Sequence, residues 1–257
     1  NPINYTDTNG DPQTEYIGSP LIVKLDASGN HVWHKVFRYY MTSAIPANRI
    51  YNDASFVDVV EVSDGYVAVG SYDVNNHLSA TNSDGDDATP TDAIILKTTT
   101  AGAITYHKQV DNPSNSTSQS SKYLSAISTT SAGAILAAGG DNSRELIQKF
   151  AGAGGFSNTF SRLFTYSTSI FGTVTDPADV SQVYEVNGGT DIVTMAMYIK
   201  PLSFFSNSIH RVNSTATANV WAKRYDFNLI SILPRGSKTS DNGYIAMAMT
   251  AGGANYD

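Results

Sequence analysis

The chain has 257 residues, 15% of them charged, and a net charge of −7 at pH 7. The acidic excess is spread along the chain and no basic stripe stands out, so we expect no nucleic-acid partner. The absence of cysteine excludes disulfides and thiolate metal sites. The longest apolar stretches are far too short for a transmembrane segment, which takes about 20 residues.

The first predicted elements are an N-terminal arm and a β-hairpin. Residues 1–20 are polar and turn-rich, so we predict a loop or arm there. Residues 21–37 have an apolar run ending in Lys24, a turn with Gly29, an aromatic residue at Trp33 and a second base two residues later. Such a turn places Lys24 roughly opposite Trp33, where a cation–π contact is possible. We call this unit a base–aromatic hairpin.

A second kind of hairpin follows at residues 56–72. Its turn, Asp64-Gly65, precedes a nearly continuous apolar strand, Tyr66-Val67-Ala68-Val69-Gly70. A strand that is apolar on both faces must be covered on both sides, as when neighbouring sheets stack on each other. We call this unit a glycine-turn hairpin.

The two hairpins alternate along the rest of the chain. Base–aromatic hairpins recur at 93–110, 145–164 and 207–225, and glycine-turn hairpins recur at 123–139, 180–198 and 229–250. No convincing amphipathic helix lies between them. The pattern predicts an all-β fold for residues 21–257, a β-propeller of four-stranded antiparallel blades with glycine-turn hairpins inside and base–aromatic hairpins outside.

The order of the hairpins at the two ends of the chain is consistent with two arrangements. The chain begins with an outer hairpin and ends with an inner one. If these complete one blade, the ring closes with four blades and its sheet edges are protected. If they do not, the chain is an arc of a larger propeller.

The first unit resembles a known kind of repeat. The stretch from Lys24 to Trp33, with Asp26, Gly29 and the Trp, resembles the tryptophan-docking turn of quinoprotein-like propeller repeats. The alternation with glycine-turn strands is similar to the repeat arrays of bacterial secreted and surface propellers. The resemblance covers all four units, although Tyr106 and Phe160 replace the Trp in two of them. Quinoproteins often use a vicinal cysteine pair, which this chain lacks, so we predict no cofactor.

The inner hairpins supply candidate ligand-binding residues. Each places a polar residue near its start among apolar neighbours, and in a propeller the innermost strand lines the axial channel. A ring of these residues would hold water, an ion or a small ligand. The four residues are Asp58, Ser125, Ser181 and Ser231.

Two glutamates extend this candidate set. Glu61 and Glu185 lie four residues before their glycine turns. Converging carboxylates would suggest glycoside hydrolysis, which needs an acid and a base or nucleophile on either side of the bond. Only two of the four repeats carry the glutamate, so we keep both as binding candidates and predict no catalytic residue.

Two acidic turns are candidate calcium sites. Closely spaced side-chain oxygens suit a structural Ca²⁺, which takes six to eight oxygen ligands. The same residue types also favour solvated turns on conformational grounds, and both readings stay open. The residues are Asp7, Asn9 and Asp11 in one turn and Asp84, Asp86 and Asp87 in the other.

Three functions are consistent with these patterns. The first is a non-catalytic module of the cell exterior for adhesion, scaffolding or assembly of a surface structure. The high content of Ser, Thr, Asn, Gly and Tyr in the chain is typical of secreted and cell-surface proteins. The second is a propeller that binds or cleaves glycans, and the third is a subunit of an extracellular filament with residues 1–20 as an added strand. The expected partners are cell-surface proteins, glycans or copies of the chain.

Overall fold

The fold is all-β, as predicted. The computed structural model describes residues 2–6, 12–16, 19–37, 40–41, 50–51, 54–73, 91–110, 122–141, 144–152, 157–165, 179–200, 204–225, 235–239 and 243–247. Within these ranges the regular structure is strand, apart from one 3₁₀ turn at Asn187–Gly189. None of the helical structure in these ranges has the length and apolarity to span a membrane.

Three four-stranded antiparallel sheets form the body of the molecule, which confirms the predicted sheets. Each is a meander that joins a glycine-turn hairpin to the base–aromatic hairpin after it. The first sheet contains β7 (Ala54–Val62), β8 (Gly65–Asp73), β9 (Thr91–Thr99) and β10 (Ile104–Val110). The second contains β11 (Lys122–Thr129), β12 (Ile135–Asp141), β13 (Arg144–Phe150) and β14 (Asn158–Thr165). The third contains β15 (Asp179–Val186), β16 (Asp191–Lys200), β17 (Phe204–Asn213) and β18 (Asn219–Tyr225).

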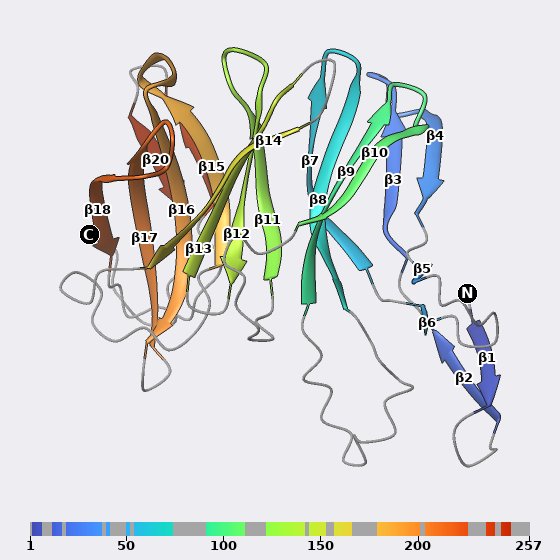
Figure 1. Ribbon diagram of the computed structural model, residues 1–257. Coiled ribbons are helices and arrows are strands. Elements are labelled where there is room, and N and C mark those ends of the chain that lie inside the picture. Colours follow the sequence, from blue (N-terminus) through green and yellow to red (C-terminus); the bar gives the residue numbers. More distant parts are fainter. Residues whose placement is uncertain are drawn as a thin grey trace, which may run out of the picture.

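Two further hairpins have half the strands of such a sheet, and we call them half-sheets. The N-terminal half-sheet is β3 (Leu21–Leu25) with β4 (His31–Val36), and the C-terminal one is β19 (Arg235–Lys238) with β20 (Tyr244–Met247). Figure 1 shows the sheets side by side in chain order, with β3 and β4 at one end of the row and β18 and β20 at the other. Among the described residues, the two half-sheets are not paired with each other.

Residues 1–20, the predicted N-terminal loop or arm, contain a pair of short strands. Strand β1 (Pro2–Thr6) pairs antiparallel with β2 (Pro12–Tyr16). Both segments contain β-branched and aromatic residues, and this preference outweighs their polar, turn-rich composition. A further short pair joins β5 (Tyr40–Met41) to β6 (Ile50–Tyr51).

The base–aromatic hairpins superimpose in register. In each, the base lies directly opposite the aromatic residue, and a bulge follows between the base and the next residue of its strand. The predicted pairing of Lys24 with Trp33 is therefore confirmed, and it recurs in every copy. The four pairs are Lys24–Trp33, Lys97–Tyr106, Lys149–Phe160 and Arg211–Trp221.

The apolar core lies between the sheets. In β12, Ile135 and Ala137 pack towards the first sheet, whereas Leu136 and Ala138 pack towards the third. All four side chains are fully buried. The strand is thus covered on both faces by its neighbours, as its sequence predicts.

A matched pair of leucines tests how much this stacking stabilises the fold. Leu146 and Leu21 both lie three residues before the base of their hairpins, but Leu146 is 1% exposed and Leu21 is 51% exposed. We expect Leu146→Ala to lower the free energy of unfolding by about 2–5 kcal/mol, and Leu21→Ala by less than about 1 kcal/mol. Urea denaturation of dilute protein measures both. Equal losses would contradict a core made by sheet-to-sheet contact.

Candidate functional site

The polar residues near the start of the inner hairpins do not occupy equivalent positions. The first strand of each sheet carries a bulge, and the extra residue is Val57, Ser125 or Ser181. The two serines therefore match Val57, and Asp58 lies one position later. A bulge adds a residue without changing the apolar composition, so the sequence alone did not reveal this shift. Ser231 lies outside the described residues.

The side chains of these polar residues form hydrogen bonds with main-chain groups. The Asp58 carboxylate accepts the N–H of Ile127 in the second sheet at 3.0 Å. The Ser125 hydroxyl donates to the carbonyl of Val180 in the third sheet. Ser181 donates to a carbonyl of its own sheet at 3.2 Å. Two of the three predicted residues thus connect neighbouring sheets.

The two glutamates are equivalent in register but point into different spaces. Glu185 Oε2 accepts the N–H and the hydroxyl of Ser131 in the second sheet, at 2.7 and 2.6 Å. Glu61 has the same place in β7 but lines a cavity on the side of the N-terminal half-sheet. Glycosidase carboxylates face each other across one bond, about 5–10 Å apart. These two glutamates do not share such a site.

The cavity lies between the N-terminal half-sheet and the first sheet. It has a volume of about 520 Å³, and its described walls offer apolar surface, carboxylates, one ammonium group and two large aromatic rings. These walls contain no histidine, serine or cysteine that could act as a nucleophile or its base. Its lining is Ile22, Val23, Lys24, Leu25, Asp26, Ala27, Trp33, Val59, Val60, Glu61 and Tyr66.

Contacts within the cavity wall fix its aromatic residues. Lys24 Nζ donates to the Tyr66 hydroxyl and lies 5.1 Å from the centre of that ring. This hydrogen bond raises the pKa of Lys24 above its ordinary value. The Trp33 ring meets Tyr66 edge-on at 5.8 Å, and its Nε1 donates to the carbonyl of Thr100 at 2.9 Å. We predicted Trp33 as the cation–π partner, but the ring beneath Lys24 comes from the adjacent sheet, which hairpin pairing alone does not show.

A buried histidine–carboxylate pair joins the second and third sheets, and the sequence analysis missed it. His210 Nδ1 lies 3.0 Å from Glu145 Oε2, and its Nε2 lies 2.5 Å from Asn219 Oδ1. The two side chains are 3% and 0% exposed. Burial lowers the pKa of His210, but the charge of Glu145 and the two hydrogen bonds outweigh it, so the pKa is raised. The sequence signal for this pair was the position of His210, directly before the repeat base Arg211 in β17.

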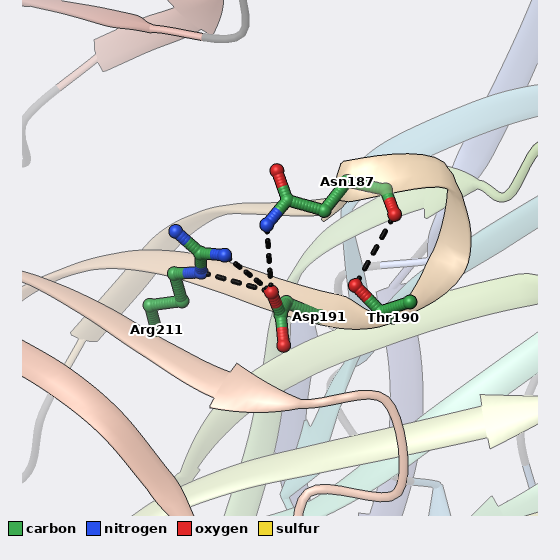
Figure 2. Close-up of polar contacts among 4 residues, drawn as sticks. All are labelled: Asn187, Thr190, Asp191 and Arg211. Atoms are coloured by element: carbon green, nitrogen blue, oxygen red, sulfur yellow. Dashed lines mark hydrogen bonds and ion pairs between the residues drawn. The ribbon is translucent and has the colours of Figure 1, made fainter.

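Two of the repeat bases, Arg211 and Lys97, also pair with acids near the glycine turns of their own sheets. Figure 2 shows Asp191 with Arg211, whose Nε donates to Asp191 Oδ2 at 3.1 Å, and with Asn187, whose amide donates to the same oxygen at 2.9 Å. The hydrogen bonds from Arg211 lower the pKa of Asp191. In the first sheet, Lys97 donates to Asp64 at 2.8 Å. These bases therefore link the two hairpins of a sheet.

The predicted calcium turns lie outside the part of the chain that the structure describes. These are the turns with Asp7, Asn9 and Asp11 and with Asp84, Asp86 and Asp87. Within the described ranges, no three His, Cys, Asp or Glu side chains gather closely enough to hold a metal ion. Calcium binding by the acidic turns stays a prediction.

The chain has no match among known protein-family models or among curated proteins. In the contacts described above, polar side chains mainly hold sheets together.

The histidine–carboxylate pair gives a pH test. The folded pKa of His210 lies above its unfolded value of about 6.5, so its stabilisation is complete below that pH and is lost as the pH rises through the folded pKa. We expect the free energy of unfolding of the natural chain to fall over this range, relative to that of His210→Gln. Urea denaturation across about pH 6 to 9 measures it. Parallel profiles for the natural chain and His210→Gln would contradict the assignment.

Proposed function

We propose that the chain is a non-catalytic scaffolding or assembly module of the cell exterior, built as an arc of a β-propeller-type ring. The observation that carries this proposal is that the polar residues form hydrogen bonds between neighbouring sheets. Asp58, Ser125 and Glu185 bond one sheet to the next, and they do not converge on one reacting centre. This is the pattern expected where the sheets themselves are the functional framework.

The half-sheets favour an arc over a closed four-bladed ring. They lie at opposite ends of the row in Figure 1, and each has one hydrogen-bonded strand pair among the described residues. Each therefore offers strand edges that other strands can extend. An assembly module uses such edges as its means of attachment.

The exterior location rests on composition. The chain has no cysteine and is only 15% charged, and its polar residues are mainly Ser, Thr, Asn and Tyr. Such surfaces are typical of secreted and surface-anchored proteins. Cell-surface proteins, glycans and copies of the chain are the partners that fit this location.

Carbohydrate binding is the second candidate, and the cavity favours it. Trp33 and Tyr66 supply aromatic surface, Glu61 supplies hydrogen-bond acceptors, and a volume of about 520 Å³ suits a small ligand. The cavity has another explanation, however, because it occupies the place that an inner hairpin fills in the other sheets.

Two equivalent glutamates distinguish the functions. For the scaffolding module, we expect no hydrolysis across a glycoside panel and no glycan-array signal that depends on Glu61. Glu185→Gln should lower the free energy of unfolding by about 1–3 kcal/mol because it weakens the bonds to Ser131, while Glu61→Gln should leave it nearly unchanged. Glycan binding or cleavage abolished by Glu61→Gln, in a chain of unchanged stability, would favour the second candidate.

A further inference from the structure

We propose that the cavity beside the N-terminal half-sheet is the seat of the C-terminal half-sheet of a second copy of this chain, joined head to tail. The two half-sheets would then form one four-stranded sheet shared between copies. This inference rests on the proposed function as an assembly module and names its partner.

The N-terminal half-sheet exposes a face that is buried elsewhere. By the register of the base–aromatic hairpins, Leu21 and Leu25 correspond to Leu146 and Phe150 of the second sheet. The first pair is 51% and 54% exposed, and the second pair is 1% and 0% exposed. Leu146 and Phe150 pack against the preceding sheet. Among the described residues, no preceding sheet covers this face of β3, although its residues are suited to one.

The first sheet has a matching uncovered position. Val59 corresponds in register to Ile127 and Val183, which are 6% and 1% exposed, whereas Val59 is 49% exposed. Val183 is covered by the inner hairpin of the preceding sheet, where Leu136 belongs to the same cluster. The cavity over Val59 is thus the place that an inner hairpin occupies in the other sheets, and no hairpin fills it among the described residues.

The C-terminal half-sheet has the complementary defect. Gly243 and Tyr244 follow its turn as Gly65 and Tyr66 follow the turn of the first sheet, so Ile245 corresponds to Val67. Val67 is fully buried against the following sheet, whereas Ile245 is 60% exposed. One junction would cover Ile245 of one copy with Val59 of the next.

Glu61 indicates which polar group the occupant of the cavity should carry. Its counterpart Glu185 accepts two hydrogen bonds from Ser131, which follows Thr130 at the inner turn of the preceding sheet. In sequence, Ser240 follows Thr239, which is the last described residue after β19. The turns are closed by the same main-chain bond, from Thr130 to Ala134 at 2.7 Å and from Thr239 to Gly243 at 2.9 Å. The sequence after β19 thus repeats the Thr-Ser pair whose serine binds Glu185, the counterpart of Glu61.

The repeat also fixes the register of the junction. In the second sheet, Ala137 lies opposite Gln148, which is the residue before the repeat base. The corresponding residues are Ala246 of β20 and Val23 of β3, so these are expected to lie opposite each other across the copies. Such strand addition uses main-chain hydrogen bonds along the edges of β3 and β20 that are unpaired among the described residues. The contact is heterologous, so it builds a ring if the rotation closes and a filament if it does not.

Cysteine cross-linking tests the junction directly, because the natural chain has no cysteine. Two single variants, Val23→Cys and Ala246→Cys, are mixed and oxidised gently, since opposite residues of paired strands come close enough for a disulfide. We expect a cross-linked dimer in the mixture, several-fold above the amount that either variant forms alone. A mixture of Ala246→Cys with Val220→Cys is the control. Val220 is 49% exposed, nearly the same as Val23 at 48%, but it lies on β18.

Three results of this experiment would overturn the proposal. They are no dimer above background, equal cross-linking with the Val220 control, and a cyclised monomer as the main product of a chain that carries both Val23→Cys and Ala246→Cys. The last result would place the occupant in the same chain. None of them depends on glycan binding or hydrolysis, so failure here is distinguishable from failure of the proposed function.

Sedimentation of the cysteine-free chain gives a second measurement. Val59→Asp places a charge where Ile245 of the partner copy would pack, so it should raise the dissociation constant for self-association at least about tenfold. Val220→Asp, at a side chain of equal exposure outside the junction, should leave it unchanged. A chain that stays monomeric at every concentration, or equal effects of the two variants, would contradict the proposal.

Discussion

The fold depends on strands that are apolar on both faces. Ile135 and Leu136 of β12 are fully buried on opposite faces of the strand, and they reach this state because a sheet lies on each side. Burial of apolar area is the main favourable contribution to folding. Each sheet therefore needs both neighbours, and the molecule grows as a row of sheets, each stabilised by the adjacent ones.

This constraint also explains the ends of the row. Where the described residues include no neighbouring sheet, side chains whose equivalents in other repeats are buried become exposed, as at Leu21, Val59 and Ile245. Leu21 and Ile245 lie on the two half-sheets, and Val59 lies on the first sheet, in the wall of the cavity beside the N-terminal half-sheet. The cavity with Trp33, Tyr66 and Glu61 lies between the N-terminal half-sheet and the first sheet, where the described residues include no inner hairpin, so the presence of the cavity and the exposure of Val59 have one cause.

The sequence predicted the features that repeat and missed those that depend on contacts between repeats. Alternation of two hairpins, the base opposite the aromatic residue and the double burial of β12 all follow from local patterns, and the structure contains them. The bulge at Val57 was hidden, because an extra residue leaves composition unchanged. The pairing of His210 with Glu145 and the bond from Glu185 to Ser131 join residues from different sheets, and no spacing within one hairpin indicates them.

Amide hydrogen exchange tests the central claim, that stacked sheets with doubly buried strands hold the fold together. Strands β8 and β12 are paired and covered on both sides, so we expect their amides to exchange only through global unfolding. In dilute protein, the amides on the free edges of β3 and β20 should exchange much faster. Uniformly fast exchange in β8 and β12, at the rate of these edges, would contradict the account.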